Sequence, residues 1–300
     1  MITFVHDKNI TITMLNHFSF LSLLHHVTII SALSGVNTQI LNASPPDGSC
    51  IFSARVLNRL SREDAQHVVD TTLLPIEQYG SRVKASKDSQ GFDPMELIVG
   101  SDPRLCFSYG EFPIHSTDAL IDLALNYIPP FHSRVQMLDL GSGCARLVCY
   151  FALTRGSKSQ PWSVSGLEIS EILSREAIRA TTTGVETKLL DLDHHKIDGY
   201  NNLSLYLGAA EDLRNVISRA NIIFSYCSTF TTDHFSIELG AMILDRQWSE
   251  LLANVCCNGC IAITTDRALD PAYGWELVDR LEVDNREVMG SIGYIQILRK

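Results

Sequence analysis

This 300-residue chain has no excess of basic residues: 24 Lys and Arg stand against 34 Asp and Glu, for a formal net charge of −10. Proteins that bind DNA or RNA through the phosphate backbone normally carry a basic face, because neutralised phosphates supply most of the affinity. The basic residues here are scattered along the chain. The sequence therefore favours a small molecule or a protein as substrate and predicts no direct nucleic-acid binding.

Charge is missing altogether from Asn9 through Pro46. Within this stretch "FSFLSLLHHVTIISALSG" has the apolar core of a signal peptide and a small-residue cleavage site. Its paired histidines and its Ser and Thr residues argue against a stable membrane span. We therefore expect residues 1–47 to be a targeting-like or disordered segment, secretory or organellar. The alternatives are a buried helix or a misassigned gene start, with the protein then cytoplasmic or nuclear.

The eight cysteines form no repeated metal-binding pattern. "CCNGC" (Cys256, Cys257 and Cys260) contains one CxxC, but no second CxxC or HxxxH follows at zinc-finger spacing. The sequence predicts a helix-to-strand turn at this point and no metal site.

Beyond Pro130, apolar strand-like segments alternate with helical ones. Five strand–helix units are predicted, with strands in "RVQMLDL", "WSVSGLEI", "LSLYLG", "NIIFSYCS" and "GCIAITTD". Such alternation predicts a mostly parallel sheet covered on both faces. Two further strand-like runs, "WELVDRLEVD" and "GSIGYIQILRK", have no helix between them and predict a closing antiparallel pair.

The predicted fold class is therefore α/β: a Rossmann-like, doubly wound, mostly parallel seven-stranded sheet with a C-terminal antiparallel strand pair and an N-terminal helical arm. Residues 48–104 are predicted to be that arm and a loop, with helix from about Ser53 to Gly80 and a surface loop in "SRVKASKDSQGFDP". Residues 105–300 are predicted to be the sheet domain. In it "HFSIELGAMILDRQWSELLANV" is predicted to be one helix.

The turn after the first predicted strand, in "LDLGSGCARL", is the natural ligand site, because ligands of open α/β sheets bind at the carboxyl ends of the strands. Gly141 and Gly143 flank Ser142 and let a ligand approach the backbone. A dinucleotide site would have the pattern GxGxxG, but Arg146 stands at the third glycine position. Asp139 would also place negative charge beside a pyrophosphate. Both features disfavour a nicotinamide-dependent reductase.

The same features suit a ligand that has a cationic amine and no phosphate, such as S-adenosylmethionine. Glu168 ends the next strand, about 20 residues further on, where an acid binds ribose hydroxyls. "GAAEDL" ends the third strand, and Glu211 or Asp212, which follow Ala210, could accept a hydrogen bond from the adenine amino group. Acids at three successive strand ends predict a site for this cofactor.

The stretch from Tyr109 to Lys300 resembles the class I S-adenosylmethionine-dependent methyltransferases. "LDLGSGCARL" matches their first motif, "GLEIS" the second, "GAAEDL" the adenine motif and "NIIFSYCSTF" the fourth strand; Ala145 stands where the first motif usually has glycine. The resemblance implies methyltransferase activity, S-adenosylmethionine as cofactor and a methyl-acceptor substrate as partner, with residues 105–300 as the methyltransferase domain.

Within this class, "YGE" (Tyr109 to Glu111) resembles the non-SET histone-lysine methyltransferases of the disruptor-of-telomeric-silencing type. That resemblance implies that Tyr109 and Glu111 lie over the methionine part of the cofactor, with Glu111 facing its ammonium, and it implies a protein-lysine acceptor. "SYCSTF" lacks the asparagine that the family has beside the acceptor, and the family's basic nucleosome-binding extension is missing too.

Ser225 and Tyr226 follow the fourth strand and are the candidates for lining the acceptor site, with ordinary core packing as the alternative for Tyr226. Methyl transfer is an in-line displacement that needs little acid–base help, so holding the nucleophile near the methyl group provides most of the acceleration. A catalytically silent, S-adenosylmethionine-binding regulatory protein is the alternative function, because fold alone does not separate it from an enzyme.

Overall fold

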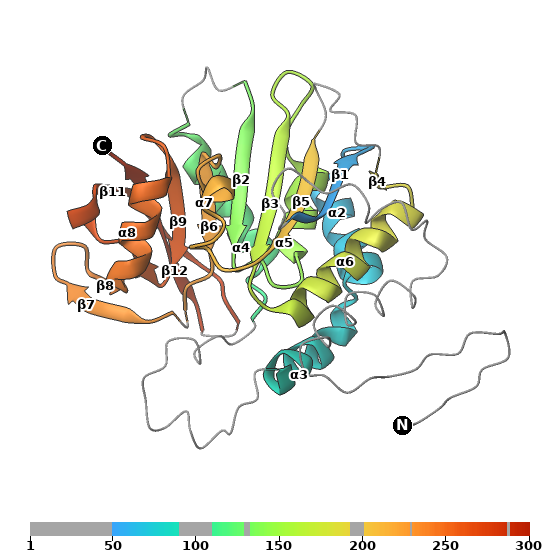
Figure 1. Cartoon of the computed structure of the whole chain (residues 1–300), viewed down its shortest axis with the longest axis horizontal. Helices are drawn as coiled ribbons and strands as arrows, with labels where there is room; N and C mark the ends of the chain where they lie inside the picture. The colour runs from blue at the N-terminus through green and yellow to red at the C-terminus, as the bar shows by residue number, and fades with distance from the viewer. Residues whose placement is uncertain (1–49, 90–109, 129–132, 193–200, 229, 287–288) are drawn as a thin grey trace, which may run out of the picture. The chain divides into compact units, whose positions relative to one another are not determined.

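The computed structural model describes residues 50–89, 110–128, 133–192, 201–228, 230–286 and 289–300. The chain divides into two compact units, Met1–Pro46 and Asp47–Lys300, and every described residue lies in the second. The main-sheet strands are β1 Cys50–Val56, β2 Val135–Leu140, β3 Trp162–Glu168, β4 Leu190–Asp191, β5 Asn202–Leu207, β6 Ile222–Ser225, β9 Ile261–Thr265, β11 Trp275–Val283 and β12 Ser291–Leu298. Their order is β11-β12-β9-β6-β2-β3-β5-β1-β4 (Figure 1).

Seven adjacent strands of this sheet confirm the predicted Rossmann-like arrangement. β5, β3, β2, β6 and β9 run parallel to one another. β12 is antiparallel to β9, and β11 is antiparallel to β12, as expected for the closing pair. The sheet has nine strands rather than seven, because β1 pairs antiparallel with β5 and β4 pairs antiparallel with β1.

The strand β1 corrects the prediction that residues 48–104 form only a helical arm and loop. Phe52, Ala54 and Val56 are buried and alternate with more exposed residues, which is the period of a half-buried strand. Figure 1 shows β1, in blue, beside β5, from which it is far apart in sequence. The arm begins only at helix α2 (Arg62–Val68). Ser61 caps the N-terminus of this helix, because its hydroxyl accepts a hydrogen bond from the Asp64 N–H at 3.1 Å.

Three other segments also differ from the prediction. Helix α3 (Tyr79–Ser89) occupies most of the predicted surface loop. Strands β7 (Thr232–Ser236) and β8 (Ala241–Leu244) precede helix α8 (Arg246–Val255) where one long helix was predicted. Gly240, at φ 60°, takes the left-handed conformation that the turn between these strands requires. With β10 (Arg267–Ala268) they form a second sheet of order β10-β8-β7.

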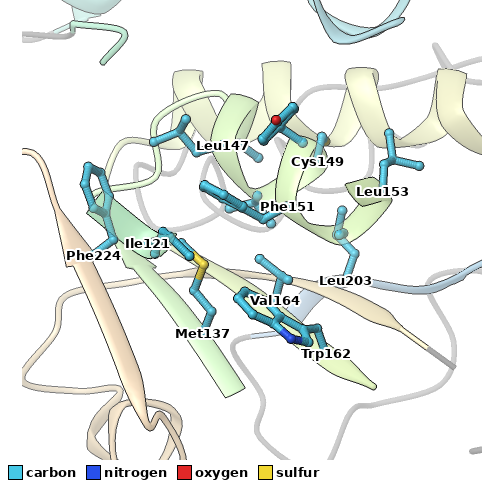
Figure 2. Close-up of a cluster of buried hydrophobic side chains, with 14 of the residues drawn as sticks. Ile121, Met137, Leu147, Cys149, Phe151, Leu153, Trp162, Val164, Leu203 and Phe224 are labelled. Carbon is cyan, nitrogen blue, oxygen red and sulfur yellow. The ribbon is translucent and has the colours of Figure 1, made fainter. Parts of the chain in front are cut away.

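Helices cover both faces of the main sheet, as predicted. On one face, side chains of α2, α4 (Ile114–Leu125), α5 (Arg146–Thr154) and α6 (Glu171–Glu186) form the first core. On the other face, side chains of α7 (Arg214–Ile217) and α8 form the second core. Met137 and Leu138 of β2 point to opposite cores, as successive strand residues do. Figure 2 shows part of the first core, where Phe151 and Leu153 of α5 lie over Val164 and Trp162 of β3. No helix in the described part of the chain has the length and apolarity that a membrane crossing requires.

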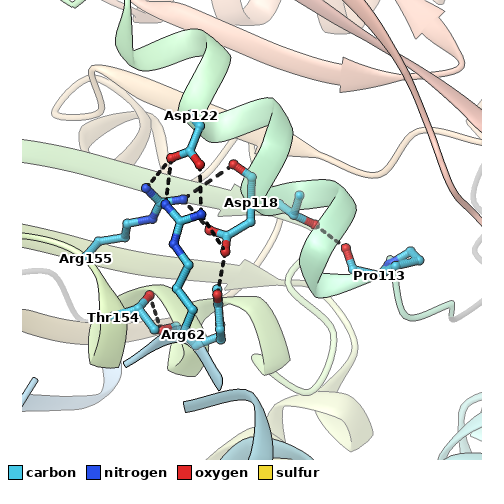
Figure 3. A network of polar contacts seen from close by, with 8 residues as sticks. Arg62, Pro113, Asp118, Asp122, Thr154 and Arg155 are labelled. Atoms are coloured by element: carbon cyan, nitrogen blue, oxygen red, sulfur yellow. Dashed lines mark hydrogen bonds and ion pairs between the residues drawn. The ribbon is translucent and has the colours of Figure 1, made fainter. Parts of the chain in front are cut away.

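A polar network ties the arm to the first core (Figure 3). Arg155, just after α5, binds Asp118 and Asp122 of α4 through its two Nη atoms. Tyr150 donates its hydroxyl to Asp118 Oδ2 at 2.5 Å. Arg62 of α2 makes two hydrogen bonds to Asp122, at 2.9 and 3.0 Å. Three helices that are distant in sequence are therefore joined by charge-assisted hydrogen bonds.

Candidate functional site

The turn between β2 and α5 has the backbone geometry that its glycines suggest. Gly141 and Gly143 have φ values of 81° and 54°, and Ala145 at 63° is also left-handed. The N–H groups of Gly141 and Ser142 both donate to the Leu167 carbonyl, at 2.9 and 3.0 Å. Ala145 therefore occupies a conformation that costs a residue with a Cβ more than it costs glycine. This explains physically why glycine is usual at that position of the matching motif.

Glu168 lies at the end of β3, beside this turn, and its carboxylate links the turn to the next helix. Oε2 accepts the Gly143 N–H at 2.8 Å, and Oε1 accepts the Ser170 N–H at 2.7 Å. The residue is buried. Burial raises the pKa of the Glu168 carboxyl, and hydrogen bonds from the backbone offset part of this rise. The sequence placed Glu168 at this strand end, and the structure brings it into direct contact with the glycine turn.

Asp139 of β2 is a second buried carboxyl next to Glu168. Burial and, to a smaller extent, the charge of Glu168 raise the pKa of Asp139 to about 8. Among the described residues neither carboxyl has a Lys, Arg or His within ion-pair distance. Two neighbouring acids without a cationic partner form a site that favours positive charge.

The loop after β5 completes the row of strand ends, because β2, β3 and β5 are neighbours in the sheet. The N–H of Gly208, the first residue after β5, donates to the Glu168 carbonyl at 3.0 Å. In the loop that follows, Ala210 is buried, while Glu211 and Asp212 are exposed. The carboxylates of this loop are therefore accessible at the same edge as the glycine turn.

Glu111 lies in a cluster of charged residues that the sequence did not suggest. Its Oε1 accepts from Arg82 Nε and Nη2, at 3.0 and 2.6 Å, and its Oε2 lies 3.5 Å from Arg146 Nε. Arg146 also pairs with Asp70 at 2.7 Å. Arg82 is almost fully buried on α3, in a stretch predicted to be a loop, so no sequence signal marked it. Tyr109, the other residue of the predicted lid, lies outside the described residues. The role of both at the cofactor stays a prediction.

Ser225 ends β6, which lies next to β2 in the sheet, and Tyr226 follows it. The Ser225 hydroxyl is buried and donates to the Leu140 carbonyl at 3.0 Å, which fixes the end of β6 against the start of the glycine turn. The Tyr226 ring is half-buried and packs on Phe112, with 5.0 Å between ring centroids. Ser225 is therefore tied to the start of the glycine turn through its hydroxyl, and Tyr226, the next residue, is held by its contact with Phe112.

A chain of side-chain hydrogen bonds holds the segment after β6. Asn285 donates from Nδ2 to the Tyr226 hydroxyl at 3.0 Å and to Ser291 Oγ at 2.8 Å. Ser291 Oγ donates to Asp266 Oδ2 at 3.0 Å, and the Ser228 hydroxyl donates to the same oxygen. Sequence reasoning missed Asn285 because it belongs to the β11–β12 connection, 59 residues from Tyr226.

We predict that Asn285→Ala lowers the free energy of unfolding by about 1–3 kcal/mol, because Asn285 is buried and its loss leaves two hydroxyls without their donor. Urea denaturation followed by far-UV circular dichroism measures the change. Asp284→Ala is the matched control: its side chain is 90% exposed, so we expect a change within about 0.5 kcal/mol. Equal effects of the two substitutions would contradict the role given to Asn285.

The described residues contain no group of three or more His, Cys, Asp and Glu placed to hold a metal ion. The CCNGC segment forms the helix-to-strand turn that was predicted. Cys256 ends α8, Gly259 has a φ of 84°, and Cys260 directly precedes β9.

No protein-family model matches the chain, and no curated protein matches it. Solved structures resemble it at low identity. TrmN from Thermus thermophilus is 15% identical with a TM-score of 0.37; the match covers 65% of this chain and 49%, about half, of TrmN. The rRNA methyltransferase aviRa from Streptomyces viridochromogenes is 14% identical with a TM-score of 0.40, covering 63% and 86%. An S-adenosylmethionine-dependent methyltransferase from Clostridium acetobutylicum is 10% identical with a TM-score of 0.38, covering 64% and 93%. Similarities this weak do not assign a function.

Proposed function

We propose that this chain is an S-adenosylmethionine-dependent methyltransferase whose cofactor binds at the carboxyl ends of β2, β3 and β5. The observation that carries the proposal is the pair of buried carboxyls, Asp139 and Glu168, beside the left-handed glycine turn. Burying a carboxylate without a cationic partner is unfavourable, and a ligand that brings positive charge relieves the cost. A pyrophosphate would increase it.

The residues at the site fit the parts of such a cofactor. Asp139 suits the ammonium group, Glu168 suits ribose hydroxyls, and Glu211 or Asp212, after Ala210, suits the adenine amino group. The left-handed turn from Gly141 through Ser142 to Gly143 lets the ligand approach the backbone closely. When bound, S-adenosylmethionine supplies an electrophilic methyl group on a sulfonium.

The chain's contribution to the reaction is placement. Ser225 and Tyr226 border the acceptor side, and Asn285 orients the Tyr226 hydroxyl there. A nucleophile held near the methyl group in line with the breaking bond needs little further catalysis. If the acceptor is a lysine, desolvation beside the rings of Tyr226 and Phe112 favours its neutral, nucleophilic form.

We propose a protein acceptor, with lysine as the group methylated. The "YGE" segment supports this, as does the net charge of −10, which disfavours a phosphate-rich partner. RNA, the acceptor of the rRNA methyltransferase aviRa, is the alternative. A silent cofactor-binding protein would bind S-adenosylmethionine and transfer no methyl group to any protein fraction.

We predict that S-adenosylmethionine binding at pH 7 releases a proton, on the order of one per site. Ligand-free Asp139 has a pKa of about 8 and is mostly protonated at this pH, and a nearby positive charge favours the ionised form. Calorimetric titrations in two buffers of different ionisation enthalpy measure the released proton. By the same linkage, the stability of the ligand-free protein falls as the pH rises from about 4 towards 8, because only the folded state keeps this proton.

The control is Asp139→Asn, which has no proton to release and a similar shape. We expect the wild type to release about one proton more than this variant when the cofactor binds. Any proton that the amine of the ligand exchanges is the same for both proteins and cancels in the comparison. Equal release from both proteins would remove Asp139 from the ammonium site. No binding of S-adenosylmethionine to the wild type would overturn the proposed function.

A further inference from the structure

The β7–β8 hairpin carries an unusual share of the exposed apolar surface. Phe235, Ile237 and Met242 are 56%, 90% and 39% exposed, and they are three of the six large hydrophobic residues exposed in the described part of the chain. Phe235 and Met242 are direct cross-strand partners, so their side chains share one face of the small sheet. Apolar residues gathered on one surface mark interaction sites more often than scattered ones do.

The opposite face of the hairpin is anchored to the main sheet. Ala241 and Ile243 of β8 are buried in a small core with Tyr294 of β12. The Asp245 N–H donates to the Thr231 carbonyl at 3.0 Å and closes the base of the hairpin. The exposed face is therefore held on a rigid support.

β7 is also an edge strand. Within the described ranges it pairs only with β8. An edge strand presents a row of backbone donors and acceptors to which another extended chain can add. A polypeptide can bind such a surface in two ways. Its backbone pairs with the strand edge, which provides affinity, and its side chains contact the exposed apolar residues, which provides selectivity.

The hairpin lies on the acceptor side of the proposed site. β7 begins shortly after Tyr226, and β10, which pairs with β8, directly follows Asp266. Asp266 accepts the Ser228 hydroxyl, so the segment bearing Tyr226 and the small sheet are fixed to the same residue. A chain that added to β7 would therefore bind to the strand that follows the segment bearing Tyr226.

The charge of the hairpin indicates the chemistry of the partner. Residues 231–245 include Asp233, Glu238 and Asp245 but no Lys or Arg. Other nitrogen-bearing side chains on or near the small sheet are His234, 3.5 Å from Asp233; Arg280, whose Nη1 donates to the Leu239 carbonyl at 3.5 Å; and Arg267 of β10, the register partner of Met242. An acidic, apolar surface repels nucleic-acid phosphates and attracts a polypeptide that has both apolar and basic side chains.

We propose that the β7 edge binds an extended, lysine-containing apolar segment of a protein and thereby presents the methyl acceptor to the site. The presentation of an acceptor rests on the proposed methyltransferase function. The binding of the segment rests on the hairpin alone.

Hydrogen exchange of the full chain tests this inference. The probe is a synthetic peptide of about ten residues that alternates valine and lysine, long enough to span a strand. We expect those amides of β7 residues 232–236 that point away from β8 to exchange at least about tenfold more slowly with the peptide than without it. A peptide with glutamate in place of lysine and a uridine oligonucleotide are expected to have no such effect.

Phe235→Ser and Met242→Ser should each weaken peptide binding at least about tenfold and leave S-adenosylmethionine affinity unchanged. Ile76→Ser, an equally exposed apolar site outside the hairpin, is the control and should bind the peptide normally. Slow exchange of the outward-pointing β7 amides in the free chain, no protection of them by the lysine peptide, or their protection by the oligonucleotide would each overturn the inference. If the peptide protects β7 but the cofactor does not bind, only the methyltransferase function is refuted. If the cofactor binds but the peptide does not protect β7, only the binding of a polypeptide at the β7 edge is refuted.

Discussion

Replacing Asp118 by alanine is expected to lower the free energy of unfolding by about 3–5 kcal/mol, since removing one partner of a buried ion pair leaves the other charge uncompensated. Asp118 and Arg155 are both buried. Asp118 also accepts the Tyr150 hydroxyl, which is buried as well (Figure 3). The substitution therefore leaves a guanidinium and a phenol with unmet hydrogen-bonding groups in the first core.

Urea denaturation measures this loss, and Asp118→Asn provides a second variant that keeps the volume of the side chain if the alanine variant does not fold. The matched control is Asp122→Ala, one helical turn further along α4. The Asp122 side chain is 43% exposed and pairs with Arg62, which is 53% exposed, and with buried Arg155, which keeps Asp118 as its other partner. We therefore expect a smaller loss than at Asp118, about 1–2 kcal/mol. Similar losses at the two positions would show that burial of the charge is not what makes Asp118 important.

Replacing Glu168 by alanine is expected to weaken S-adenosylmethionine binding by about 1–3 kcal/mol, or roughly fivefold to 150-fold, because hydrogen bonds to a charged group have about that strength. Calorimetric titration of the cofactor measures the change. Glu171→Ala is the control, because Glu171 is an exposed acid three residues away that pairs only with Arg175 in the described structure. It should bind the cofactor as the wild type does.

Glu168 also accepts the N–H groups of Gly143 and Ser170, so the alanine variant could weaken binding simply by disturbing the turn. Glu168→Gln separates the two effects. Its side-chain oxygen still accepts an N–H, but it has lost the negative charge and one acceptor. We expect its thermal midpoint to stay closer to that of the wild type while its cofactor affinity falls. Unchanged affinity in both variants would remove Glu168 from the ribose site.

The sequence predicted those elements of the fold that are marked by a hydrophobic pattern among neighbouring residues. The strands β2, β3, β5, β6 and β9 are apolar runs separated by helical periodicity, so their type and parallel direction could be inferred without the structure. The positions of Asp139 and Glu168 at strand ends followed from the same pattern, because neighbouring parallel strands bring their carboxyl ends to one edge.

The missing parts depend on pairings across long stretches of chain. The sequence predicts a helix over β7 and β8, because the apolar run "AMIL" of β8 is compatible with either a helix or a strand. Only the pairing of β8 with β7 and β10 makes it a strand. Arg82 and Asn285 lie in polar segments with no periodicity, and they become recognisable only when Glu111 and Tyr226 are placed beside them. Side-chain partners of this kind leave no mark in a single sequence.

The position of β1 has a consequence for the synthesis of the protein. β1 leaves the ribosome well before its partners do, because Arg55 pairs with Asp191, 136 residues later, and Ser53 meets Ser204, 151 residues later. Because contacts between distant residues form slowly, β1 stays unpaired until β4 and β5 have been translated. During that interval its apolar side chains lack their native cover, so this strand is the segment of the nascent domain for which protection by a chaperone would matter most.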